Sequence, residues 1–273
     1  MLFLSVAAAI VPACLSCSRT ETIKVMSSNV RVGTAKDGDN DWDIRRTAYV
    51  AMLADVAPAV FGVQEALDFQ LSYIKEKCPQ YEAVGVGRDD GVSKGEHMSV
   101  LYDKNLMELL DWGTYWLSET PDVPSKGWDA ACYRTTTWTL LKSKKTGREF
   151  YFVNTHLDHV GEEARKNGLA RIVERIAAMN PEGRPMILTG DFNVTPDSPC
   201  LVDLDKMMKS ARVCAESSDD KGSWTGWGRV SEVIDYIYYS GFDKCTDFKV
   251  VDKEYDGKPF VSDHYPVIST LVF

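Results

Sequence analysis

The sequence predicts one α/β or layered α+β domain built on mixed β-sheet. From Ile23 onward, short β-rich runs alternate with longer helical stretches, and no linker interrupts the alternation. Short turns join some of the predicted strands and helices separate others, which is typical of a mixed sheet. The 273 residues, 44% of them hydrophobic, suffice for a sizeable core in a single globular domain.

Runs of apolar, β-branched and aromatic residues predict the strands. In chain order they span residues 22–30, 59–65, 97–103, 108–117, 134–143, 149–157, 184–192, 232–240 and 265–273. Helical periodicity predicts helices over 43–57, before Pro58, and over 162–179, before Pro181. Residues 118–133 are rich in Pro, Gly and small polar residues, so we expect a long loop at the rim of a pocket.

The N-terminus has a different composition. It opens with about a dozen apolar or small residues, too few to span a membrane but enough for the core of an export signal. Small residues precede Cys14 and Cys17, which resembles a bacterial lipoprotein signal, although no basic residue precedes the apolar run. We expect residues 1–21 to be signal and tether, residues 22–273 to be the folded domain, and the protein to be exported and lipid-anchored at the periplasmic face or cell surface. A buried N-terminal helix is the alternative.

The net charge argues against a non-specific nucleic-acid binder, and the cysteine spacing argues against a structural zinc site. The net charge of −9 would repel a long polyanion, which argues against a non-specific nucleic-acid binder. The densest basic cluster, LKSKKTGR at 141–148, is typical of a solvent-exposed hairpin turn. The five cysteines after residue 21 are scattered without zinc-site spacing, so we expect mostly buried thiols.

Polar side chains recur where predicted strands end or begin. Asp191 and Asn193 close one apolar run and share a side, while Phe192 points away from them. Other strand ends carry Ser28 and Asn29; Gln64 and Glu65; Asn154, His156 and Asp158; Asp235; and Asp263 and His264. Burying an unpaired carboxylate costs several kcal/mol, so we expect these groups to meet around a cation or one another.

Six motifs in this order resemble the endonuclease/exonuclease/phosphatase superfamily, which includes DNase I-like nucleases. They are SSNVR at 27–31, QE at 64–65, NTHLDH at 154–159, GDFN at 190–193, IDYIY at 234–238 and SDHYP at 262–266. The resemblance implies a four-layered sandwich, with two mixed β-sheets face to face and helices outside. It also implies a divalent-metal phosphoesterase site at one edge.

Roles for the metal and the attacking water follow from the resemblance. Glu65 is expected to hold Mg²⁺, for which Mn²⁺ would substitute, with Asn29 and Asp263 as supporting ligands or as residues behind the ligands. Asp191 is expected to orient or deprotonate the attacking water. Asn193 would be a neutral donor to the phosphate or to the nucleophile.

The resemblance also assigns groups around the phosphate. His264 would stand over the non-bridging oxygens, oriented by buried Asp235. His156 would contact the phosphate from another side, with Glu96 orienting it as in the nucleases. The group that protonates the leaving oxygen is left open. The other histidines, His97 and His159, are expected to be ordinary surface or core residues.

Substrate contacts are expected from Arg88, Arg134, Lys126, Trp128 and Asp158. Arginine binds phosphate through paired donors, and tryptophan stacks on a base or a ring. For the arginines the alternative is an ion pair, with Asp89 or Asp90 in the case of Arg88; for Trp128 it is core packing.

The expected function is Mg²⁺-dependent hydrolysis of a phosphoester by in-line attack of water. A compact phosphorylated sugar, inositol or lipid head group is the favoured substrate. A nuclease is the alternative, because Arg88, Lys94, Lys126 and Arg134 offer a local basic patch. A catalytically silent binding module is a more remote alternative. No protein partner is inferred, and contact with a membrane would be through the lipid anchor alone.

Overall fold

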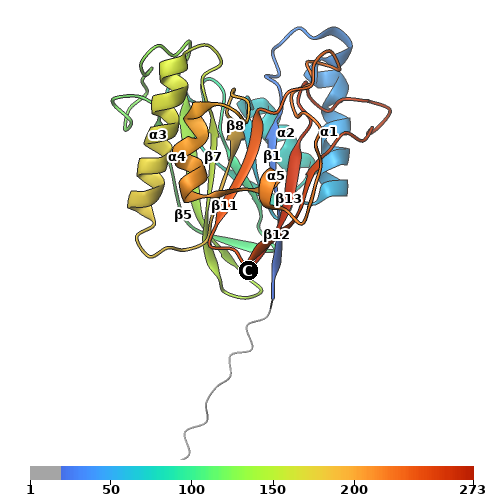
Figure 1. Cartoon of the computed structure of the whole chain (residues 1–273). Helices are drawn as coiled ribbons and strands as arrows, with labels where there is room; N and C mark the ends of the chain where they lie inside the picture. The colour runs from blue at the N-terminus through green and yellow to red at the C-terminus, as the bar shows by residue number, and fades with distance from the viewer. Residues whose placement is uncertain (1–19) are drawn as a thin grey trace, which may run out of the picture.

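The computed structural model describes residues 20–273. The expected signal segment, with Cys14 and Cys17, therefore lies almost entirely outside the described residues. Two β-sheets pack face to face and helices cover the two outer faces (Figure 1), which confirms the expected layered sandwich.

The first sheet has seven strands. They are β1 (Thr22–Asn29), β2 (Val60–Gln64), β3 (Tyr81–Val84), β4 (Val100–Asp103), β10 (Ser217–Ser218), β12 (Lys244–Val250) and β13 (Val267–Val272). Their order is β10-β12-β13-β1-β2-β4-β3. At the centre, β1 pairs with β2 in parallel and with β13 antiparallel, so the sheet is mixed as expected.

The second sheet has six strands. They are β5 (Met107–Trp116), β6 (Thr135–Ser143), β7 (Glu149–His156), β8 (Met186–Asp191), β9 (Lys209–Ser210) and β11 (Asp235–Ser240). Their order is β5-β6-β7-β8-β11-β9, with β7 and β8 parallel and the other neighbours antiparallel. This sheet is mixed as well.

Helices cover the outer faces because each buries one apolar stripe. Helices α1 (Trp42–Val56) and α2 (Asp68–Lys77) pack on the first sheet, and α3 (Glu162–Met179) and α4 (Val202–Met207) pack on the second. Short helices complete the chain: α5 (Ala211–Cys214), η1 (Gly38–Asn40) and η2 (Pro199–Leu201). Helix α1 ends at Val56, and the residue that caps it, Ala57, is left-handed with φ 46° and precedes Pro58.

None of the helices within residues 20–273 combines the length and the apolar character needed to cross a membrane.

The two sheets meet in an apolar core that also contains a buried polar link through Asn154. Phe150 and Phe152 of β7 lie in the same cluster as Val25 of β1 and Val60 of β2. Near the end of β7, the Asn154 amide crosses between the sheets: Nδ2 donates to the Val63 and Ser99 carbonyls at 2.8 and 3.1 Å. A Cβ at Gly62 would lie 2.2 Å from Asn154 Oδ1, so glycine is required for this close approach.

Sequence periodicity missed some elements. Helix α2 has no long apolar repeat; it buries Leu71 and Ile74 together with the polar Gln70. Strand β12 has a bulge between Cys245 and Asp247, which breaks the two-residue alternation that marks a strand. The predicted strand over 232–240 begins only at Asp235.

Candidate functional site

Polar residues from both sheets meet at one edge of the sandwich. In the parallel pairs, Asn29 lies beside Gln64 and His156 beside Asp191; in the antiparallel pair of β8 and β11, Asp191 lies opposite Asp235. A cavity of about 570 Å³ opens there. Its lining residues are Arg31, Val32, Glu65, Arg88, Glu96, Cys132, Arg134, His156, His159, Asp191, Asn193, Trp224, Glu232, Ile234, Asp263 and His264.

Asn29 links two carboxylates across the sheets. Its Nδ2 donates to Glu65 Oε1 at 2.9 Å and to Asp191 Oδ2 at 3.0 Å. The other Glu65 oxygen accepts from the Val32 amide at 2.9 Å. Burial raises the pKa of Glu65, but the Asn29 hydrogen bond and the nearby His264 charge outweigh it and lower that pKa below its ordinary value. The carboxylate is therefore ionised and fixed in direction.

Three residues at this edge have a left-handed backbone. Arg31, Glu65 and Asn193 have φ values of 57°, 62° and 51°. For arginine and glutamate this conformation costs of order 1 kcal/mol or more, and it persists where the surrounding contacts enforce it. The strain aims all three side chains into one cavity.

Asp191 and Asn193 share the cavity side of their segment, as expected. Phe192 is fully buried and stacks on Tyr236, with ring centroids 4.9 Å apart. Asp191 Oδ1 accepts from the Asn193 backbone amide at 3.0 Å, and Asn193 Nδ2 donates to the Leu157 carbonyl at 3.0 Å. The buried ring thus fixes the backbone that carries both polar groups.

His264 bridges two carboxylates. Its Nδ1 lies 2.8 Å from Asp235 Oδ2 and its Nε2 lies 3.8 Å from Asp191 Oδ2. Burial lowers the pKa of His264, but Asp235 and Asp191 outweigh it and raise that pKa to about 10. His264 is therefore a cation that donates a hydrogen bond from Nδ1 to Asp235 and lines the cavity.

His156, unlike His264, is a neutral imidazole. Burial, together with the charges of Arg134 and Arg88, lowers the pKa of His156 well below its ordinary value of 6.5. Its Nε2 lies 3.5 Å from Asp191 Oδ2, and its Nδ1 is buried without a hydrogen-bond partner among the described residues. A neutral imidazole at this position can donate a hydrogen bond to a phosphate.

The donor set suits a hard divalent cation. Glu65, Asp263 and Asp191 bring carboxylate oxygens to one cavity, and Asp263 Oδ2 lies 3.6 Å from Arg31 Nη1. Burial and the neighbouring Glu65 carboxylate raise the pKa of Asp263, which is the response of an acid placed beside other acids. A bound cation would relieve that repulsion, so the residues fit a metal.

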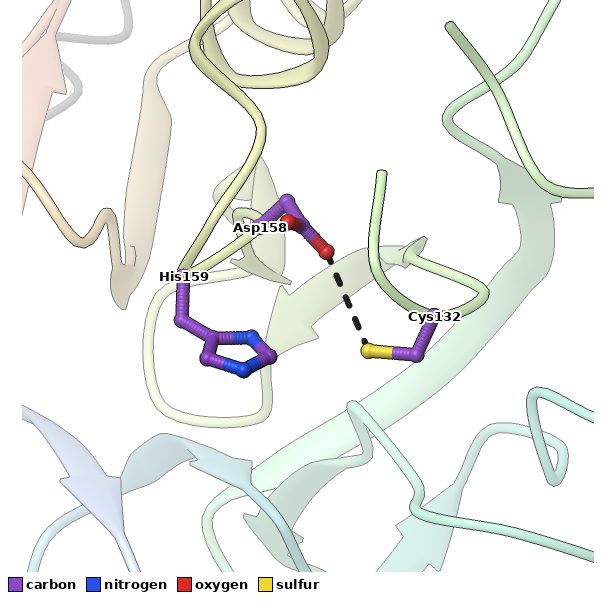
Figure 2. A group of neighbouring side chains, drawn as sticks. All are labelled: Cys132, Asp158 and His159. Carbon is purple, nitrogen blue, oxygen red and sulfur yellow. Dashed lines mark hydrogen bonds between the residues drawn. The ribbon is translucent and has the colours of Figure 1, made fainter. Parts of the chain in front are cut away.

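Cys132, Asp158 and His159 form another cluster of possible metal ligands (Figure 2). Arg134 lies among them: its Nε donates to Asp158 Oδ2 at 3.1 Å and its Nη2 lies 2.8 Å from His159 Nδ1. Since a guanidinium is always charged, His159 Nδ1 must be the acceptor. The cation in this cluster is Arg134 itself, so we do not assign a metal here.

The family model of the endonuclease/exonuclease/phosphatase family matches residues 26–264. The chain belongs to this family. A family member from Bacteroides vulgatus is 33% identical, with a TM-score of 0.87 over 92% of this chain and 98% of that one. A mannosyl-6-phosphatase from Bacteroides thetaiotaomicron is 32% identical, with a TM-score of 0.87 over 92% of this chain and 100% of that one. A protein of Acanthamoeba polyphaga mimivirus is 27% identical over 90% of this chain and 98% of its own length.

Membership establishes the general activity. Endonuclease/exonuclease/phosphatase enzymes are metal-dependent phosphoesterases, and this chain is one of them. The layered fold and the cavity at the strand ends agree with that activity.

Glu96 differs from the role that the nucleases suggest. Its two carboxylate oxygens accept from Arg88 Nη1 and Nη2 at 2.7 and 2.9 Å. Within residues 20–273, no hydrogen bond joins Glu96 to His156. Both Glu96 and Arg88 line the cavity as a pair, so Glu96 orients Arg88 rather than His156.

Asp158 also differs from its expected role. It does not line the cavity, because its carboxylate accepts from Arg134 and from the backbone amides of Ala131, Val160 and Gly161. Burial raises the pKa of Asp158, but these hydrogen bonds outweigh it and hold that pKa well below its usual range. Asp158 therefore positions Arg134.

The structure does not bring Lys126 or Trp128 to the cavity. The segment 118–130 folds back on itself: Ser118 Oγ lies 2.6 Å from Ser125 Oγ, and the Ala130 amide donates to the Gly127 carbonyl at 3.0 Å. Trp128 is half-buried at a left-handed turn with φ 48°, and Lys126 is exposed. His159, expected to be ordinary, does line the cavity.

Arg45 is a residue that sequence reasoning missed. It is 1% exposed, and its guanidinium donates to the Asn40, Val261 and Arg31 carbonyls at 2.9, 2.7 and 3.1 Å. Trp42 and Trp227 lie within cation–π distance, at 5.0 and 5.6 Å. Burial lowers the pKa of Arg45 to about 10. One buried cation thus ties helix α1 to the turn that carries Arg31 and to the loop before Asp263.

Arg45→Lys is expected to lower the free energy of unfolding by about 3 kcal/mol, because a single ammonium cannot serve three separated buried carbonyls. Urea denaturation measures the change. The neighbouring Arg46 is the matched control: it pairs with Asp43 at 3.1 Å on the surface, so Arg46→Lys should change stability by under about 1 kcal/mol. Equal losses in the two variants would contradict the role given to Arg45.

The titration of Asp191 gives a pH prediction for the metal-free protein. Burial and the nearby Asp235 carboxylate raise the pKa of Asp191 from 3.8 to about 7. Between these values the folded state holds more protons than the unfolded state, so this contribution to stability is complete below pH 3.8 and is lost as the pH rises through about 7. The free energy of unfolding of Asp191→Asn should therefore rise relative to that of the wild type between about pH 4 and about pH 7, by roughly 1 kcal/mol per pH unit. Parallel urea curves in chelator measure this difference, and a constant difference would contradict it.

Proposed function

We propose that the protein is a Mg²⁺-dependent phosphomonoesterase that acts on a small phosphorylated polyol, such as a sugar, inositol or lipid head-group phosphate. The observation that carries the proposal is the shape and charge of the cavity. Its volume of about 570 Å³ suits a small molecule, and its walls place carboxylates and histidines around one point. The mannosyl-6-phosphatase with 32% identity supports a sugar phosphate.

In this proposal the metal is held by Glu65 and Asp263, with Asn29 orienting Glu65 through its amide. When bound, Mg²⁺ supplies electrostatic stabilisation of negative charge on the phosphate. Mn²⁺ would substitute, because it also prefers oxygen ligands.

The remaining groups handle the water and the phosphate. Asp191 accepts the proton of the attacking water, since burial keeps its pKa close to neutral and the Asn29 amide fixes one of its oxygens. The His264 cation, held by Asp235, neutralises non-bridging oxygens, and neutral His156 donates a hydrogen bond to the phosphate. Asn193 adds a neutral donor at the rim.

A nuclease is less well supported. Two arginines of the expected basic patch are paired, Arg88 with Glu96 and Arg134 with Asp158. Lys126 does not line the cavity, and the net charge is −9.

Competing substrates test the proposal. The full-length chain with Mg²⁺ should have a higher kcat/KM for hexose 6-phosphates and inositol monophosphates than for single- or double-stranded oligonucleotides. Affinity should change little between low and moderate salt, because a compact substrate makes few phosphate contacts. Faster cleavage of oligonucleotides, with affinity that falls steeply with salt, would replace the proposal with a nuclease.

We also propose export with a lipid anchor, supported by the apolar run and the small residues before Cys14 and Cys17. Fatty-acid labelling of the full chain in a bacterial host should be lost when the lipidated cysteine is replaced. Labelling that survives replacement of both Cys14 and Cys17 would contradict the anchor.

A further inference from the structure

The cavity lining includes two hydrogen-bonded pairs, Arg88 with Glu96 and Arg134 with His159. We name these four residues the arginine wall. Each guanidinium in it is matched by a carboxylate. Arg88 forms a two-pronged pair with Glu96, at 2.7 and 2.9 Å, and Arg134 Nε binds Asp158 at 3.1 Å. The wall therefore carries arginine donors without an excess of positive charge.

The wall offers hydrogen-bond acceptors as well as donors. The Glu96 carboxylate lines the cavity beside Arg88. His159 Nδ1 accepts from Arg134 Nη2 at 2.8 Å, so the ring proton is on Nε2 and is available to a ligand. The hydrogen bonds that Arg134 makes within the described residues use Nε and Nη2, and none of them uses Nη1.

This mixture of groups matches hydroxyls better than a second phosphate. A hydroxyl donates and accepts, whereas a phosphate dianion only accepts. A second phosphate against the wall would meet the Glu96 carboxylate directly. A further carboxylate, Glu232, lines the cavity elsewhere and is exposed. A second phosphate would also compete with Glu96 for the Arg88 donors. Bringing two anions together in this way discriminates strongly between ligands.

We propose that the arginine wall binds the hydroxyl groups of a neutral polyol leaving group and rejects substrates that carry a second phosphate. The inference rests on the proposed function and narrows it. The substrate class becomes monophosphates of uncharged polyhydroxylated alcohols, as opposed to bisphosphates and polyphosphorylated inositols.

The test compares two substrates that share a hexose ring with a third that lacks hydroxyl groups. For the full-length wild-type chain with Mg²⁺, kcat/KM is measured for glucose 6-phosphate, for glucose 1,6-bisphosphate and for phenyl phosphate, which has no hydroxyl groups. We expect kcat/KM for glucose 6-phosphate to be about tenfold or more above that for glucose 1,6-bisphosphate, since contact between like charges costs more than about 1.4 kcal/mol. The kcat/KM for glucose 6-phosphate should also be higher than that for phenyl phosphate.

The Glu96→Gln variant removes the negative charge while keeping the shape of the side chain. The ratio of kcat/KM between monophosphate and bisphosphate should fall by about tenfold in this variant. The matched control is Glu82→Gln, an exposed glutamate that pairs with Lys104 at 3.1 Å on the surface, and it should keep the wild-type ratio.

Each outcome has a separate meaning. Equal kcat/KM for glucose 6-phosphate and glucose 1,6-bisphosphate in the wild type would overturn the inference and leave the proposed function standing. That comparison needs no variant, so it decides the matter even if Glu96→Gln does not fold. Metal-dependent cleavage of oligonucleotides without turnover of any of the three small substrates would overturn the proposed function itself.

Discussion

Asp191→Asn should lower kcat by about 10²–10⁴-fold, because the carboxylate that we propose as the acceptor of the water proton is lost while the shape of the side chain is kept. KM should change much less, since Asn193, His264 and His156 still line the cavity around the phosphate. Steady-state kinetics with a hexose 6-phosphate at saturating Mg²⁺ measures both constants.

The same segment provides the control. Asp197 lies six positions further along, is exposed and binds Thr195. Asp197→Asn should keep the wild-type kcat. If Asp191→Asn raised KM and left kcat unchanged, Asp191 would be a binding residue and the role of base would pass to another group.

Glu65→Gln should weaken metal binding by on the order of a hundredfold or more, because the variant removes a charged oxygen that Asn29 and Val32 hold in place. Two measurements report it without activity: calorimetric titration with Mn²⁺ and the rise of the unfolding temperature on adding Mg²⁺. The wild type should bind and be stabilised, and the variant should require far more metal.

Glu76 on α2 is the matched control, an exposed glutamate that pairs with Lys77 at 2.8 Å. Glu76→Gln should bind metal as the wild type does. Unchanged Mn²⁺ affinity in Glu65→Gln would remove Glu65 from the metal site.

Much of the fold was predictable because strands and long helices leave strong local patterns. The helix expected over 162–179 has those bounds in the structure, and most strand boundaries differ by one to three residues. Helix α2 and strand β12 were not predicted, since the helix buries polar Gln70 and the bulge in the strand breaks its alternation. Contacts from distant parts of the chain stabilise both elements, and such contacts leave no pattern in the local sequence.

The site was predictable to a different extent. Carboxylates and histidines at strand ends stand out against apolar runs, and the cavity does bring Glu65, Asp191 and His264 together. The sequence did not indicate which arginine or histidine each carboxylate would bind. Glu96 binds Arg88, and Asp158 turns from the cavity to hold Arg134, because loop geometry decides which neighbour each carboxylate meets.

The burial of Arg45 could not be predicted from the sequence either. In the sequence it is one of two adjacent arginines on an amphipathic helix, and either could be exposed. Which of them is buried depends on carbonyls contributed by Asn40 and Val261, one close in the chain and the other 216 residues away. Contacts of this kind appear only in the folded structure.

We propose that this cavity hydrolyses a small phosphomonoester in a metal-dependent reaction. The most direct measurement is release of inorganic phosphate from a hexose 6-phosphate by the full chain, first in chelator and then with Mg²⁺ restored. We predict no turnover in chelator and full recovery with Mg²⁺, and for Asp191→Asn with Mg²⁺ a kcat about 10²–10⁴-fold below that of the wild type. Equal turnover with and without the metal would contradict the account.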